Sequence, residues 1–313
     1  MSSAPVAPTY KSGKDSVAPT RTTATETARI SAMEFLTKLA TEVSKGQVDL
    51  PCFPNVVLRI RNALADPNNN AEKTVTIVGA EPRLAARLLQ TANSAAFNNT
   101  GKPLTDLRTA ITRLGQQLVQ SAAMAFAMQH MKNEDSLKPI AKPMTELWAE
   151  SIIVASICQV VARRTKINPD EAFLTGLLHG IGRLYIMVRA VGKGAEIGDS
   201  DSYTDLVAGW QASIGKAVLE NWGFAEELAE AIGAQDDLNG ERMGDRKRKR
   251  DADLADVLIA SIALCEVLKT PPPREVKLDS IAAFGTIGLT VEHCSAIMTH
   301  AQNQLGSLQK ALG

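Results

Sequence analysis

Several features that mark particular classes of protein are scarce in this chain or missing from it. Aromatic residues make up 4% of the 313 residues, and 34 Lys and Arg balance 34 Asp and Glu, so the formal net charge is zero. A neutral chain lacks the excess positive charge that attracts nucleic acid or anionic surfaces. The N-terminus has no charged start followed by an apolar stretch, and no apolar run approaches the roughly 20 residues that cross a bilayer. The sequence therefore predicts a cytoplasmic protein without a secretory signal or a membrane span.

Cysteine is also scarce, and the cysteines are scattered along the sequence. None of them stands in a Cys-x-x-Cys pair. Isolated thiols of this kind are usually reduced and buried as small apolar side chains. We therefore expect free thiols, most of them in the core, at Cys52, Cys158, Cys265 and Cys294.

Hydrophobic residues make up 45% of the chain, and they recur at helical spacing. No segment alternates apolar and polar residues convincingly, as a half-buried strand does. The sequence predicts an all-α fold, in which a multi-helix domain packs on an N-terminal helical bundle. We expect helices from about residue 28, over 55–65 and 74–79, from Pro82, after Thr105 as N-cap, over 148–164, after Asn168 as N-cap, and over 205–221, 225–234, 253–268 and 290–312.

Composition divides the chain into four predicted parts. Residues 1–28 are Ser, Thr, Ala, Pro and Lys without periodicity, as in a disordered tail. A helical part over 29–135 follows, and Pro139 and Pro143 mark a boundary before a second helical part over 139–240. A basic loop and C-terminal helices occupy 241–313. Within the second part, Asn168-Pro169-Asp170-Glu171 is a strong helix start, and we expect that helix to carry His179.

One stretch of the second part carries chemical information: Gly176-Leu177-Leu178-His179-Gly180-Ile181-Gly182-Arg183-Leu184. In HD-type metal-dependent phosphohydrolases, adjacent His and Asp side chains on a helix bind a divalent cation. Such a cation lowers the pKa of a bound water and polarises a phosphoryl oxygen. Here His179 is followed by Gly180, which has no side chain and cannot bind a metal. The stretch resembles an HD frame that has lost its aspartate.

Other segments, in the same order, resemble the HDOD domain, the HD-related output domain of bacterial signalling proteins. They are Leu50-Pro51-Cys52-Phe53-Pro54, the block from Glu81 to Phe97 with its Asn93-Ser94-Ala95-Ala96-Phe97 end, Leu104 to Leu107, Ala110 to Gly115, Ile214-Gly215 and Trp222-Gly223-Phe224. The resemblance runs from about Leu50 to about Asp237, although the Glu81 block usually begins with Asp. It marks as signature residues Pro51, Pro54, Asn93, Ser94, Phe97 and Gly115. Asn93 and Ser94 either fix the break between a helix and the Phe97 loop or contact a partner or a ligand.

The resemblance implies a degenerate HD domain. Active HD enzymes carry a first histidine on the preceding helix, where this chain has Glu150. Gln211 stands in a segment that often carries histidine, and Gln235-Asp236 stands where related domains often show a His-His pair. A lone neutral imidazole holds a cation weakly. We therefore expect no catalytic residue, no metal and no cofactor, and a protein that is not an enzyme.

Two interpretations of His179 stay open. It is either a core histidine with a hydrogen-bond partner, or part of a remnant polar pocket that binds a small ligand without turning it over. The residues of that candidate pocket are Glu150, His179, Arg183, Gln211, Gln235 and Asp236.

Two further features of the sequence have alternative interpretations. His293 and His300 would lie on one helix face, but two turns separate them by about 10 Å, too far for one ion to bridge. The run Arg246-Lys247-Arg248-Lys249-Arg250 either contacts nucleic acid or an anionic membrane, or is a solvated loop. Acidic residues surround this run and no aromatic residue interleaves it, which favours the loop.

The resulting functional hypothesis is a non-catalytic signal-transduction module that acts through protein–protein interaction. HDOD domains commonly accompany pathways with histidine kinases or cyclic dinucleotides, so components of such pathways are the partners that the resemblance implies. The alternatives are a residual metal-dependent phosphohydrolase or a nucleotide sensor that uses the cleft around His179. Neither nucleic acid nor a membrane is an expected partner.

Overall fold

The computed structural model describes residues 24–48, 50–66, 71–94, 98, 103–191, 201–237, 251–269 and 281–312, and in these residues it contains helices and no strand. The all-α prediction is therefore confirmed. The elements are α1 (Ala24–Ser44), α2 (Asn55–Ala65), α3 (Ala71–Gly79), α4 (Pro82–Ala92), α5 (Leu107–Lys132), the 3-10 helix η1 (Asp135–Ile140), α6 (Ala141–Ala162), α7 (Pro169–Leu178), α8 (Ile181–Val191), α9 (Asp201–Asn221), α10 (Glu226–Gly233), α11 (Leu254–Leu268), α12 (Ala282–Ile287) and α13 (Val291–Leu312). Most of the predicted tail, and its predicted disorder, lies outside the described residues.

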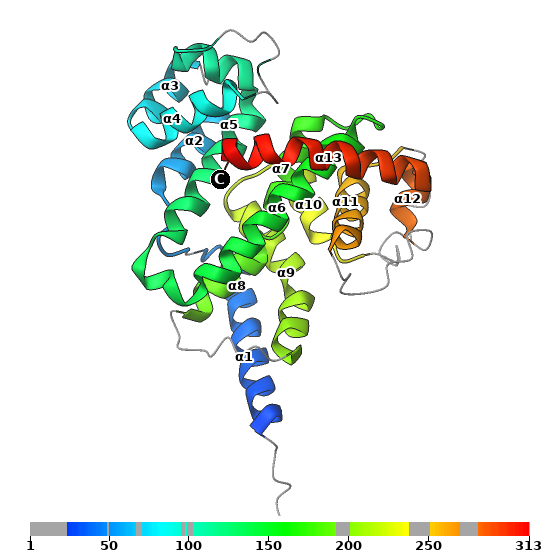
Figure 1. The fold of residues 1–313 in the computed structure, drawn as a ribbon. Coiled ribbons are helices and arrows are strands. Elements are labelled where there is room, and N and C mark those ends of the chain that lie inside the picture. The colour runs from blue at the N-terminus through cyan, green and yellow to red at the C-terminus, as the bar shows by residue number, and fades with distance from the viewer. Residues whose placement is uncertain are drawn as a thin grey trace, which may run out of the picture.

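Helices α2, α3 and α4 group around the first part of α5, at one end of the molecule (Figure 1). The apolar stripe predicted for α4 explains its packing, because Leu84, Leu88 and Ala92 are all fully buried. Pro82 occupies the first turn of α4, where its missing N–H removes no helical hydrogen bond. Local sequence and burial thus agree in this part of the chain.

Helix α5 bends at Gly115, whose φ of 73° and ψ of 174° lie outside the helical region. A left-handed φ favours glycine, and Gly115 is open on the side where a Cβ would stand. The N-cap of α5 is Asp106, so the prediction of Thr105 was wrong. The Asp106 carboxylate accepts hydrogen bonds from the hydroxyl and the backbone N–H of Thr109, both at 2.7 Å, and these bonds lower the pKa of Asp106.

The predicted boundary at Pro139 and Pro143 contains helix on both sides. Pro139 lies in η1, and α6 begins at Ala141 rather than at Trp148. Pro143 is tolerated because it falls in the first turn of α6, where backbone N–H groups have no helical partner. The chain therefore passes from η1 into α6 without leaving helical structure.

The segment Asp135–Ala162 is long and apolar enough to cross a membrane, with a mean hydropathy of 1.3 over its most apolar window. However, 61% of that window is buried inside the fold. Helix α6 packs against α7, α11 and α13, so its apolar character serves the protein core.

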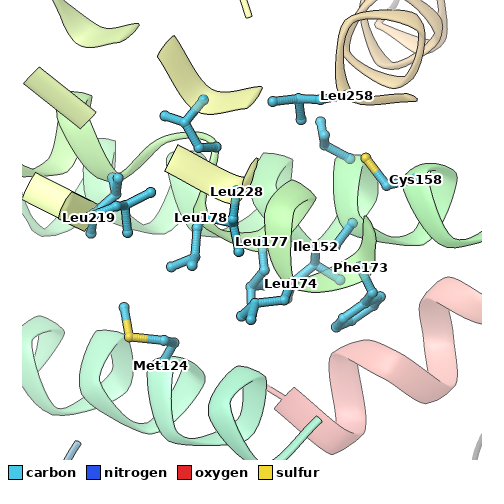
Figure 2. Packing of buried hydrophobic residues seen from close by; sticks show 14 of the residues in the cluster. Met124, Ile152, Cys158, Phe173, Leu174, Leu177, Leu178, Leu219, Leu228 and Leu258 are labelled. Carbon is cyan, nitrogen blue, oxygen red and sulfur yellow. The ribbon is translucent and has the colours of Figure 1, made fainter. Parts of the chain in front are cut away.

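The hydrophobic core is centred on α7. Figure 2 shows Leu174, Leu177 and Leu178 of α7 between Met124 of α5 and Leu258 of α11. Three of the cysteines, Cys158, Cys265 and Cys294, are buried and free as expected, whereas Cys52 is half-buried. Burial raises the pKa of both the Cys158 and the Cys265 thiol to about 12.

Helices α8 and α9 approach each other closely at Gly182. A Cβ at this position would lie 1.9 Å from the Gln211 carbonyl oxygen and 2.7 Å from the Gly215 nitrogen. Only a residue without a side chain permits this contact between two backbones. Helix α9 in turn lies beside α1, as Figure 1 shows, and the Arg189 guanidinium of α8 holds Glu42 of α1 at 2.7 Å.

Candidate functional site

His179 lies at the C-cap of α7, directly after the last helical residue Leu178. The prediction that the helix carries His179 was therefore wrong by one residue, although its predicted start was confirmed: Asn168 Oδ1 accepts the Asp170 N–H at 2.8 Å. The His179 side chain is 7% exposed, and its Nδ1 lies 2.8 Å from the Gly176 carbonyl oxygen. Since a carbonyl only accepts, Nδ1 carries the proton and donates. Burial lowers the pKa of His179, so its neutral form is favoured.

Lys269, which belongs to no motif in the sequence, completes the polar surroundings of His179. Lys269 is the C-cap residue of α11, and its ammonium donates to Glu150 Oε1 at 3.1 Å and also to Glu266. The charge of Glu150 raises the pKa of His179, while the charges of Lys269 and Arg183 lower it, though burial is the largest effect. The structure thus places Glu150, Arg183 and Lys269 in the electrostatic environment of the imidazole.

Gly180 faces Leu147 closely, so any side chain at position 180 would meet that leucine. A Cβ on Gly180 would lie 2.6 Å from Leu147 Cδ1 and 3.2 Å from Leu147 Cγ. The small cavity at this point is lined almost entirely by apolar side chains, among them Leu147, Trp148, Leu177 and Ile181. Gly180 therefore offers no ligand atom, and Leu147 lies where a side chain at position 180 would begin.

The residues of this site do not fit a divalent metal. The positions that resemble metal-binding ones carry Glu150, whose carboxylate is paired with Lys269, and Gly180. An ammonium has no lone pair for a metal, and its positive charge opposes a second cation nearby. Within the described residues, no group of three or more His, Cys, Asp or Glu side chains is arranged to hold a metal ion.

The remaining predicted pocket residues are spread over α9 and the end of α10. Gln211 of α9 is half-buried, and its carbonyl oxygen forms the close contact with Gly182. Gln235, after α10, is 3% exposed, and its Nε2 has no hydrogen-bond partner within the described structure. The next residue, Asp236, is exposed. Among the described contacts, no hydrogen bond joins His179 to Gln211 or Gln235, so the predicted pocket is only partly assembled around the imidazole.

The sequence of this chain matches a known protein family over most of its described length. The sequence model of the HDOD domain matches residues 50–238, more than half of the chain. This chain belongs to the HDOD domain family.

Individual relatives of this HDOD protein are distant. A solved structure from Shewanella amazonensis SB2B, provisionally named a metal-dependent phosphohydrolase, is 23% identical, with a TM-score of 0.69, and the match covers 90% of this chain and 99% of that one. A provisionally named signal transduction protein from Marinobacter aquaeolei VT8 is 21% identical, with a TM-score of 0.56, over 91% of this chain and 66% of that one. An uncharacterized protein of Treponema pallidum is 23% identical over 211 residues, which are 63% of this chain and 39% of that protein's length. At these identities the solved structures establish the fold alone.

The HDOD signature residue Asn93 has a visible structural role. Its Nδ2 donates to the Leu89 and Leu104 carbonyls at 2.9 and 2.8 Å, and its Oδ1 accepts the Leu104 N–H at 2.7 Å. One side chain therefore ties the end of α4 to the segment that leads into α5. Ser94 Oγ donates to the Thr91 carbonyl at 2.8 Å, so it also closes the helix end. Phe97 lies outside the described residues.

The other signature loop packs against a segment far away in sequence. Phe53, between Pro51 and Pro54, stacks on Trp222 with ring centroids 4.7 Å apart. Cys52 in this loop has a positive φ of 63°, which turns the chain toward α2. The HDOD residues at both ends of the family match thus form one packed unit.

Of the two remaining candidate features, the structure describes the histidine pair and not the basic run. Thr290 and His293 exchange hydrogen bonds of 3.3 and 3.4 Å at the start of α13, and His300 is exposed further along that helix. The basic run 246–250 lies outside the described residues.

Proposed function

We propose that this HDOD protein is a non-catalytic regulatory module of a bacterial signalling pathway, which acts in the cytoplasm by binding other proteins. Family membership supports the signalling context, as does the name of the Marinobacter relative. The observation that carries the non-catalytic part is the Lys269–Glu150 ion pair beside His179. The partners implied by the family resemblance are histidine kinases or components of cyclic-dinucleotide pathways.

The charges beside His179 oppose the binding of a metal ion. Two carboxylates, Glu150 and Glu266, surround one ammonium, so the local positive charge is already supplied by the chain. A divalent metal that bound here would have to displace Lys269 and leave its ammonium without these partners. The neutral imidazole of His179 would be its single nitrogen ligand, which is a weak site. The residual phosphohydrolase is therefore the less favoured alternative.

One observation favours a second candidate, a small-ligand sensor. The Nε2 of Gln235 and the Nε1 of Trp148 are buried donors without a hydrogen-bond partner in the described structure. An unsatisfied buried donor costs about 1–3 kcal/mol, and a ligand with suitable acceptors would remove that cost. A nucleotide that raised the melting temperature of the wild type but not of Gln235→Leu would support the sensor.

Metal analysis tests the non-catalytic assignment. The purified full chain, from cells grown with added iron and manganese, is expected to carry far less than one metal ion per chain and to leave bis(p-nitrophenyl) phosphate intact. The matched variants are His179→Gln and, as a control, His293→Gln. Stoichiometric metal and hydrolysis that are lost only in His179→Gln would show that the protein is an enzyme.

Partner capture tests the interaction. Cross-linking in the native cell, followed by affinity purification and mass spectrometry, is expected to recover a signalling protein reproducibly. If no partner appears in cells where the protein is active, the interaction role fails, and the sensor becomes the better candidate.

A further inference from the structure

An open groove runs between α4 and the last two turns of α5, and His179 is not among the residues that line it. It encloses about 680 Å³. Arg83, Arg87 and Gln90 line one wall, at the i, i+4, i+7 spacing of a single helix face. Phe126, His130 and Asn133 line the opposite wall with the same spacing. Each wall is therefore about 10 Å long, which suits an elongated occupant.

The arginine wall has positive charge that no neighbour neutralises. Neither Arg83 nor Arg87 forms a side-chain ion pair or hydrogen bond within the described part of the chain. The acidic group on the other wall, Glu134, lies closer to His130 on its own wall, with 3.3 Å between His130 Nε2 and Glu134 Oε1. Arg87 is half-buried, and this burial lowers its pKa without an acidic partner to offset the effect. A partly buried guanidinium without a counter-ion is stabilised by an incoming anion.

The remaining chemistry of the groove favours a peptide over a nucleotide. The amide side chains of Gln90 and Asn133 face the groove from opposite walls. An amide both donates and accepts, so it can pair with the N–H and C=O groups of a peptide main chain. The spacing of the arginines also favours an extended peptide, because one helical turn separates Arg83 from Arg87 by about 6 Å. Alternate residues of an extended peptide are about 6.6 Å apart, so two acidic residues separated by one other match the two guanidinium groups.

We propose that this groove, with Arg83 and Arg87 as its anchors, binds an extended acidic segment of a protein partner, with a Glu-x-Glu or Asp-x-Glu pattern. This inference rests on the proposed interaction role and adds the surface and the chemistry of the partner. Arg83 and Arg87 bind the two carboxylates, and the amides of Gln90 and Asn133 bind the main chain between them.

Fluorescence anisotropy with the full chain tests the groove directly. The probe is a fluorescein-labelled peptide of about eight residues that alternates Glu and Ala, and the same peptide with Gln for Glu is the neutral control. Measurements at about 25 mM salt keep the electrostatic attraction, because the Debye length is then roughly 20 Å. The double variant Arg83→Gln/Arg87→Gln removes two charges from the groove. The matched variant Arg59→Gln/Arg163→Gln removes two charges from exposed positions elsewhere.

The groove variant is expected to bind the acidic peptide at least about tenfold more weakly, and the matched variant less than about twofold more weakly. Arg83→Gln alone, at an exposed position, serves if the double variant fails to fold. An equal loss in both double variants would show nonspecific attraction and overturn the proposal, as would no binding of the acidic peptide by the wild type. Binding of ATP that depends on Arg83 and Arg87, without peptide binding, would assign the groove to nucleotides and also overturn it.

The same variants separate this proposal from the function it rests on. If the wild type and the groove variant capture a signalling partner equally well in cells, the groove assignment is wrong and the interaction role stands. If the wild type binds the peptide through the groove but captures no partner, the groove stands and the interaction role fails.

Discussion

Leu147 and Gly180 should behave as an energetically coupled pair, because the side chain of one occupies the space that the other leaves open. A Cβ on Gly180 would stand 2.6 Å from Leu147 Cδ1, well inside van der Waals contact. In the wild type, Gly180→Ala is expected to lower the free energy of unfolding by about 1–3 kcal/mol through overpacking. The cost stays in that range because the clashing atom is the end of a flexible side chain.

Truncation of Leu147 should remove the destabilising effect of Gly180→Ala. Leu147→Ala alone is expected to lower the free energy of unfolding by about 2–5 kcal/mol, since Leu147 is buried and its truncation leaves a cavity. In that background the new methyl group at position 180 enters free space, so Gly180→Ala becomes neutral or stabilising. The double variant should therefore lose less free energy of unfolding than the two single variants lose together, by about 1 kcal/mol or more.

Urea denaturation of the four proteins of this double-mutant cycle measures the coupling. Gly209→Ala is the matched control, because a Cβ at this position would have no heavy atom within 4 Å in the described part of the chain. Its effect should be the same with and without Leu147. If Gly180→Ala has equal effects in both backgrounds, within about 0.5 kcal/mol, Leu147 does not fill the vacated space and the reasoning is refuted.

Three further results are expected. Gly182→Ala should destabilise the protein by about 3 kcal/mol or more in urea denaturation, because its Cβ meets backbone that cannot yield; stability equal to that of Gly209→Ala would contradict this. Asn93→Ala should lower the free energy of unfolding by about 2–4 kcal/mol, because three hydrogen bonds are lost. A fall in melting temperature of less than about 1 °C would show that Asn93 does not tie α4 to the following segment. The His179 pKa is lowered from 6.5 in the folded state, so the unfolded chain binds more protons as pH falls below 6.5. The contribution of His179 to stability is then complete above this pH and is lost as the pH falls toward the folded pKa. His179→Gln should flatten the decline in urea stability between about pH 7 and pH 5 relative to the wild type, and an unchanged slope would argue against a neutral, buried His179.

Helix boundaries were predictable where local chemistry determines them. Helix α2 has the predicted bounds, because Pro54 precedes it and the next helix-breaking pair, Asp66-Pro67, follows it. The cap at Asn168 is equally local, since its side chain accepts from a backbone N–H two residues later. Helix α8 was not predicted, because Gly180 and Gly182 are poor helix formers and only the packing on α9 explains them.

The sequence shows that Gly180 has no side chain that could bind a metal, but it does not show which side chains surround His179. Leu147 and Lys269 come from helices far from His179 in sequence, so no local pattern connects them to it. A basic residue at the end of a predicted helix was the single signal for Lys269, and the favourable interaction of a cation with any helix C-terminus explains such a residue equally well.

The ion pair of Lys269 with Glu150 has a consequence for how this protein would respond to its surroundings. A metal cofactor can be removed by a chelator, exchanged for another ion or lost when the cell is starved of it. The cation beside His179 is covalently part of the chain and is synthesised with it. The charge balance around His179 is therefore independent of the cell's supply of iron or manganese.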